Sequence, residues 1–177
     1  MPENLKHAFE LRLRDGLAQG KTLTDEKIVL HSQIWVDGQH LDEPHAIDLP
    51  LLVQSLHVPG WYEIFTCSCG VGGCAGIVEG IEVTHDAGLV CWSFRRPQSA
   101  GDLTGSALSA WEKTATPVTL TFDRAQMSNA IHAYLETVRA VVGEDPGKFA
   151  WPVCGLSVQD MLKIDPNKPF YDIEQGA

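Results

Sequence analysis

Apolar and charged residues alternate over positions 9–13, and this period of two predicts a strand with one buried face. The polar, glycine-containing segment 16–25 is predicted to be a loop. A second strand is predicted at 28–36, which is rich in residues that favour β-structure. The Asp37-Gly38 pair after it is a strong signal for a two-residue hairpin turn.

Similar signals predict the later elements. Four segments have the composition of strands: 61–67, 77–84, 89–94 and 118–122. The residues 85–88 are predicted to form a hairpin turn. The polar stretch 98–116 contains a short predicted helical turn at 106–111.

Apolar residues recur every three or four positions between 124 and 142, which predicts an amphipathic helix. Asp123 stands at its N-cap, and Gln126 three residues later gives the capping-box arrangement. Gly143 is the residue type that most often ends a helix. These signals make this helix the clearest element of the sequence.

Two short helices are also predicted, one after Asp48 and one at 158–163. Strands outnumber helices and do not alternate with them regularly, so the predicted fold class is α+β. We expect a mainly antiparallel β-sheet covered by one long helix (about 124–142) and the short helices. No composition break divides the chain, which predicts a single domain over 1–177 with a Pro-rich C-terminal segment from about 144.

The chain of 177 residues has 13 basic and 23 acidic residues, giving a net charge of −10. This charge argues against nucleic acids and anionic membranes as partners, because both are bound through Lys and Arg. It favours a basic protein partner, although solubility alone explains an acidic surface. The sequence has no apolar stretch of about 20 residues and no secretory signal, so we expect a cytoplasmic protein.

The most informative segment is a cysteine cluster, C-x-C-G-x-x-x-C-x-G, that begins at Cys67. Cys67 and Cys69 point the same way if the backbone is extended. The glycines that follow permit a tight reversal, which would bring Cys74 back beside them. Three converging thiolates supply three corners of a tetrahedral zinc site.

The fourth zinc ligand is left open by the sequence. Four residues are candidates: Cys91, Cys154, His57 and His85. Two other interpretations of the cluster stay open as well. The thiols can be packed as small hydrophobic groups without metal, or the C-x-C pair can serve redox chemistry.

The cysteine string resembles the motif that follows the catalytic domain of SET-type lysine methyltransferases. In that family three cysteines bind zinc, and a fourth comes from the catalytic domain. The resemblance therefore implies zinc ligation by Cys67, Cys69 and Cys74. It covers about ten residues, and the sequence has none of the family's catalytic-domain motifs, so it does not imply methyltransferase activity.

A longer stretch, spanning roughly 36–142, resembles an uncharacterised group of bacterial proteins. The resemblance lies in a helix followed by 61–67, the Cys-Gly turn, two strands with Cys91-Trp92, and the helix entry at 122–126. It implies a bacterial cytoplasmic protein and assigns no residue a role.

The sequence as a whole favours a binding or interaction module without catalytic activity, stapled by zinc at the Cys67–Cys74 turn. The expected partner is a protein, such as a basic toxin or enzyme. The alternative is a thiol-based redox enzyme that uses Cys67 or Cys69.

The remaining histidines give weaker signals. His40 and His45 flank two acidic residues, Asp42 and Glu43, and a solvated polar loop explains this segment better than a site. His132 is predicted at the surface or boundary of the long helix rather than as a catalytic base.

Four tryptophans are expected in the core or at its edge: Trp61, Trp92, Trp111 and Trp151. Two of them, Trp111 and Trp151, fall in less regular segments. If both were exposed, they would mark a binding patch.

Overall fold

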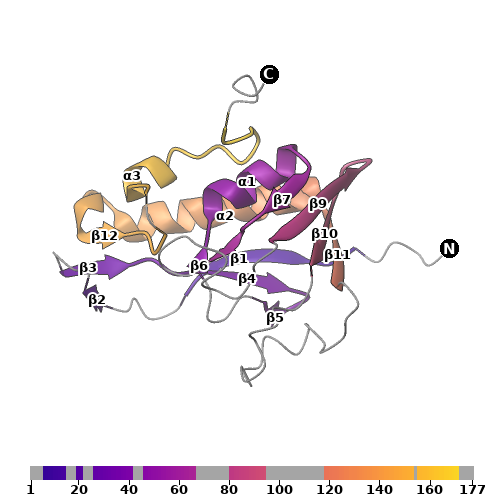
Figure 1. Cartoon of the computed structure of the whole chain (residues 1–177). Coiled ribbons are helices and arrows are strands. Elements are labelled where there is room, and N and C mark those ends of the chain that lie inside the picture. Colours follow the sequence, from indigo (N-terminus) through magenta and orange to yellow (C-terminus); the bar gives the residue numbers. More distant parts are fainter. Residues whose placement is uncertain are drawn as a thin grey trace.

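The structure is a computed structural model that describes residues 6–14, 19–21, 26–41, 46–66, 80–94, 118–153 and 155–171. It confirms the α+β prediction, because its strands pair mainly antiparallel and its long helix α2 (Arg124–Val142) packs on them. Figure 1 shows α2 running above β1 and β4. Among the described residues, no helix combines the length and the apolar composition needed to cross a membrane.

One antiparallel sheet has the order β1-β4-β5, formed by β1 (Phe9–Leu13), β4 (Ser32–Val36) and β5 (Gln39–His40). The predicted alternation buries Phe9 and Leu11, which pair with Val36 and Ile34 of β4. The turn between β4 and β5 has φ values of 50° at Asp37 and 75° at Gly38. Positive φ at both positions is what a two-residue hairpin turn of this kind requires.

A second antiparallel sheet has the order β11-β10-β9-β7, formed by β11 (Val118–Asp123), β10 (Leu89–Phe94), β9 (Ile81–Asp86) and β7 (Gly60–Tyr62). Strand β7 lies at its edge. The backbone N–H of His7 donates to the carbonyl of Thr121 at 2.7 Å. This bond joins the beginning of β1 to β11 and so links the two sheets.

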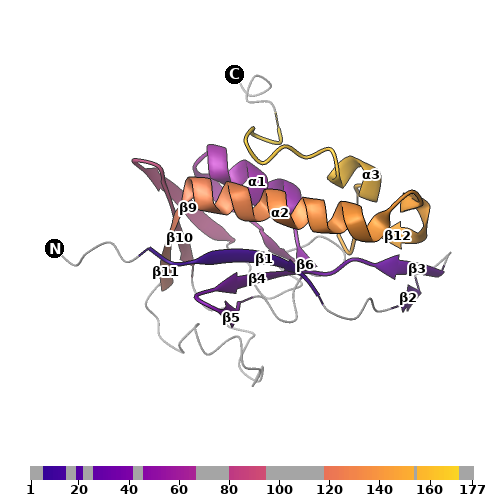
Figure 2. The same cartoon turned by 180° about the vertical axis from the view of Figure 1, so that it is seen from behind.

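The long helix has the bounds and the caps that the sequence predicts. The Asp123 side chain accepts a hydrogen bond from the Gln126 backbone at 3.1 Å, and Gly143 ends the helix with a φ of 57°. Helix α1 (Leu49–His57) begins after Asp48, whose side chain accepts from the Leu51 N–H. The two helices lie side by side above β1 in both views (Figures 1 and 2).

The core between the helices and the sheets is centred on aromatic rings. Trp92 of β10 is fully buried and makes edge-to-face contacts with Phe9, Phe65 and Phe122. Tyr134 of α2 is buried too, and its hydroxyl lies 2.7 Å from the Ser32 hydroxyl. Burial raises the pKa of Tyr134, so this hydroxyl stays neutral and serves as a hydrogen-bonding group.

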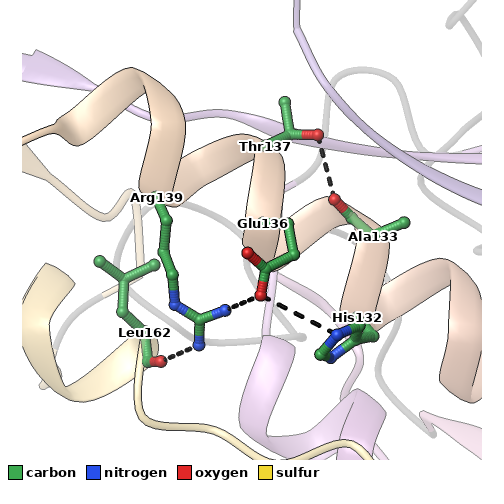
Figure 3. A network of polar contacts seen from close by, with 6 residues as sticks. All are labelled: His132, Ala133, Glu136, Thr137, Arg139 and Leu162. Carbon is green, nitrogen blue, oxygen red and sulfur yellow. Dashed lines mark hydrogen bonds and ion pairs between the residues drawn. The ribbon is translucent and has the colours of Figure 1, made fainter.

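The C-terminal segment follows α3 (Val158–Met161) and is held to α2 by polar contacts. The Arg139 guanidinium donates to the Leu162 carbonyl and pairs with Glu136, as Figure 3 shows. Nearer the start of α2, the Ser128 hydroxyl lies 3.2 Å from the Pro166 carbonyl. The Pro-rich segment therefore packs on the helix layer in this part.

Six short elements complete the described fold: β2 (Gln19–Lys21), β3 (Glu26–Val29), β6 (Ala46–Ile47), β8 (Phe65–Thr66), β12 (Phe149–Ala150) and the 3-10 helix η4 (Pro146–Lys148). The prediction of a loop over 16–25 is wrong in part, because β2 lies within it and pairs with β3. Other predicted boundaries differ as well. Strand β9 continues to Asp86, beyond the predicted 77–84, and α3 ends at Met161, before the predicted end at 163. The strands predicted at 28–36 and 61–67 differ most.

Both predicted strands are broken because their halves pair with different partners. Within 28–36, β3 pairs with β12 and β4 pairs with β1. Within 61–67, β7 pairs with β9, whereas β8 pairs with β6. The predicted stretch 98–116, with its helical turn at 106–111, lies outside the described residues.

Candidate functional site

The predicted zinc ligands Cys67, Cys69 and Cys74 lie outside the described residues, as does Cys154. The strands on either side of the cysteine segment are described. Strand β8 ends at Thr66, directly before Cys67, and β9 begins at Ile81. These flanks fix the positions of the described residues on either side of the segment.

The base of the cysteine segment is closed by strand pairing. Tyr62 pairs with Ile81, and Thr66 pairs with Ala46. Gly80 has a φ of 70°, and a Cβ placed there would lie 2.9 Å from the Tyr62 carbonyl oxygen. Only glycine fits this conformation and this close approach without strain.

Three of the candidate fourth ligands are described. His57 Nε2 lies 3.0 Å from the Pro166 carbonyl, and His85 Nε2 lies 2.8 Å from the Ser55 carbonyl. A carbonyl only accepts, so each ring donates from Nε2, and Nδ1 is the nitrogen that could bind a metal in the neutral tautomer. The Thr121 hydroxyl donates to Cys91 Sγ at 3.6 Å. Among the residues with described positions, no three His, Cys, Asp or Glu side chains come together as a metal-binding group.

Next to the base of the cysteine segment lies an exposed acidic and aromatic surface. Trp61 of β7 is 61% exposed, the largest fraction among the described large hydrophobic side chains. It pairs with Glu82 of β9, which is exposed, as are Thr84 two residues along and Glu63 just after β7. We call these four residues, Trp61, Glu63, Glu82 and Thr84, the Trp61 face.

The prediction that Trp61 lies in the core is therefore wrong. Its neighbours Tyr62 and Ile64 are buried, and the alternation along the chain turns Trp61 outward. Trp92 and Trp151 are buried as expected. The suggested binding patch required both Trp111 and Trp151 to be exposed. Trp151 is buried, so the patch is wrong for this residue, and Trp111 lies outside the described residues.

Asp48 adds a partly buried carboxylate close to this surface. Its backbone N–H donates to the Ile64 carbonyl at 2.9 Å, and its side chain caps α1. Burial raises the pKa of Asp48, and the charge of Glu63 raises it further, against the opposing effect of the Leu51 N–H. The folded protein therefore holds the protonated form of this carboxyl more tightly than the unfolded chain does.

Replacing Asp48 separates its capping role from its charge. We expect Asp48→Ala to lose about 1 kcal/mol of stability, whereas Asp48→Asn keeps a capping side chain. Because the folded pKa is raised, wild-type stability falls relative to Asp48→Asn as the pH rises through that pKa. Urea unfolding between about pH 4 and about pH 7 measures this difference. If the free energy of unfolding of Asp48→Asn falls relative to that of the wild type as the pH rises, the raised pKa of Asp48 is contradicted.

Two of the weaker histidine predictions can be followed in the structure. His132 is exposed on α2, 3.9 Å from Glu136, as the surface interpretation predicts (Figure 3). His40 stacks on Trp35 at 5.4 Å between ring centroids. The acidic residues between His40 and His45, together with His45 itself, lie outside the described residues.

One pair of polar residues in the structure was not predicted from the sequence. His7 Nδ1 lies 2.6 Å from the Asp37 carboxylate, although the two residues are 30 positions apart. The hydrogen bond from His7 holds the pKa of Asp37 below its ordinary value, and the Ala8 N–H acts in the same direction. The only sequence signal was the Asp-Gly turn, which gives no indication of which residue Asp37 meets.

Comparisons with protein-family models, with curated proteins and with solved structures find no match to this chain. The two resemblances of the cysteine segment and of 36–142 stay predictions.

Proposed function

We propose that this protein is a non-enzymatic interaction module that binds a basic protein through the Trp61 face, with a structural zinc ion in the neighbouring cysteine segment. The observation that supports this best is the exposure of Trp61, at 61%, on the edge strand β7. A side chain of this size loses favourable burial when it faces water, and binding a partner restores that burial.

The composition of the Trp61 face suits a protein interface. Tryptophan is among the residues most enriched at energetic hot spots, and surrounding residues exclude water around it. Glu63 and Glu82 lie beside Trp61, and the whole chain has a net charge of −10. Acidic groups around an aromatic anchor favour a basic partner and speed its association.

The zinc proposal rests on the spacing of Cys67, Cys69 and Cys74 and on the closed base of their segment. Pairing of Tyr62 with Ile81 closes a loop, residues 63–80, that contains all three cysteines. Less chain entropy then has to be lost when the three thiolates converge on one ion. A zinc ion there would supply folding energy to the segment beside the Trp61 face and would take no part in a reaction.

Removing the Trp61 side chain tests the interface. We expect Trp61→Ala to change the free energy of unfolding by less than about 0.5 kcal/mol, since the side chain is mostly exposed. We expect the same variant to weaken partner binding by about 2 kcal/mol, or about 30-fold in Kd. The proteins captured by wild-type and variant baits are identified, and calorimetry on the purified partner gives the two Kd values.

The charge of the face is tested with Glu82→Lys, which we expect to slow association and to reduce its dependence on salt. The matched control for Trp61→Ala is Val141→Ala on α2, because Val141 is another exposed apolar side chain, at 38%. This control should leave partner binding unchanged. A purified partner that binds Trp61→Ala as tightly as wild type would contradict the proposal.

A further inference from the structure

A cavity lies where the beginning of β1, the β4–β5 hairpin and β11 meet, away from the Trp61 face. Its volume is about 190 Å³. Four aliphatic side chains contribute its apolar lining: Val36, Leu41, Val118 and Leu120. Its polar lining includes His7 and Asp37. A cavity of this kind, mostly apolar with a few polar groups, is the usual form of a small-molecule site.

The polar groups of the cavity are fixed in one arrangement. Asp37 accepts from His7 Nδ1 at 2.6 Å and from the Ala8 N–H at 2.8 Å. The Asp37 N–H in turn donates to the Ala8 carbonyl at 3.0 Å, so the turn is fastened to the start of β1. An ionised carboxylate only accepts, so the hydrogen of the neutral imidazole sits on Nδ1. His7 Nε2 is therefore the ring nitrogen that can accept from a ligand.

Size and charge narrow the class of ligand. An apolar cavity of about 150 Å³ holds benzene, so about 190 Å³ has room for one aromatic ring with a small substituent. The Asp37 carboxylate and the net charge of −10 disfavour an anion. The lining does not select a cation either, because Asp37 is the single carboxylate among its described residues and His7 and the Ala8 N–H already occupy one acceptor position on each of its oxygens.

From this geometry we infer that the cavity is a binding site for a small neutral molecule, about the size of one aromatic ring, whose hydroxyl donates to His7 Nε2. The aliphatic residues contact the ring, and the His7–Asp37 pair orients the hydroxyl. Asp37 acts through His7 and is a positioning residue.

Phenol and benzene are the probes that test this site, by titration into the isotope-labelled protein followed by NMR. We expect saturable shifts centred on Leu41 and Leu120, with a Kd for phenol on the order of 1 mM. His7→Phe keeps a ring against Phe122, its present edge-on neighbour at 6.2 Å. This variant should weaken phenol binding about tenfold and leave benzene binding unchanged.

Val118→Trp fills the cavity and should abolish binding of both probes. If Val118→Trp does not fold, Gln39→Trp, at an exposed position of the lining, is used to block the cavity instead. Val141→Trp, on the outer surface of α2, is the control that should change neither Kd. The inference is overturned if neither probe gives saturable shifts. It is also overturned if Val118→Trp or Gln39→Trp folds and still binds the probes with wild-type affinity. Equal weakening of phenol and benzene by His7→Phe would overturn the role of its Nε2. None of these results depends on the cysteine segment or on Trp61.

Discussion

Trp92→Ala is expected to lower the free energy of unfolding by about 3–5 kcal/mol. Trp92 is fully buried, and the centroids of Phe122, Phe9 and Phe65 lie 5.0, 6.1 and 6.2 Å from its own. These rings come from β11, β1 and β8, so a cavity at Trp92 removes contacts from four strands at once. Since domains of this size have about 5–15 kcal/mol of stability in total, the variant is expected to lose a large share of it.

The size of this effect is measured by urea unfolding with two comparison variants. Trp92→Phe should cost much less than Trp92→Ala, because it keeps a ring and removes an Nε1–H that is buried without a hydrogen-bond partner in the described structure. Trp61→Ala removes the same side chain from an exposed strand position and should be nearly neutral. If Trp92→Ala costs no more than Trp61→Ala, the described core is wrong.

Loss of the proposed zinc ion is the second large effect that we expect. If free zinc is about 1,000-fold above its Kd, the ion adds about 4 kcal/mol of stability. For a chain of 177 residues this corresponds to roughly 8–16 °C in Tm. We therefore expect Cys74→Ser to lower the Tm by about this amount, and a chelator to lower the wild-type Tm to the same level.

The matched control for Cys74→Ser is Ser68→Ala, which changes a neighbouring residue and keeps all three thiols. It should retain the wild-type Tm and the wild-type response to chelator. The fourth ligand is sought with single substitutions of the four candidate residues, Cys91, Cys154, His57 and His85. A chelator that leaves the wild-type Tm unchanged would contradict the zinc proposal.

Local signals in the sequence were sufficient for the two longer helices, α1 and α2. The N-cap Asp123, the recurring apolar residues and Gly143 all act within one element, and α2 has the predicted bounds. The strand boundaries were less predictable, because they depend on partners distant in sequence. Leu30 donates its N–H to the Ala150 carbonyl at 3.0 Å, next to the pairing of β3 with β12. The first part of the strand predicted at 28–36 therefore joins a partner far along the chain, which no local pattern specifies.

The candidate site was predictable only in part. Trp61 and Glu63 stand two positions apart, so a period of two would have placed the tryptophan on the same side as a charged residue and away from the core. The default assignment of tryptophan to the core overrode this signal. The His7–Asp37 pair had no comparable signal, because a hairpin turn and the beginning of a strand 30 residues earlier meet only in the folded chain.

The proposal of an interaction module with a structural zinc ion is tested most directly by native mass spectrometry. The protein is purified without a histidine tag, and its reactive thiols are counted before and after chelation. We expect a mass increment of one zinc per chain and the release of three or four thiols together on chelation. No metal and one fast-reacting thiol would contradict this proposal and favour a redox enzyme that uses Cys67 or Cys69. No metal and slow thiols throughout would contradict the zinc site as well, and would identify the cysteines as packed side chains.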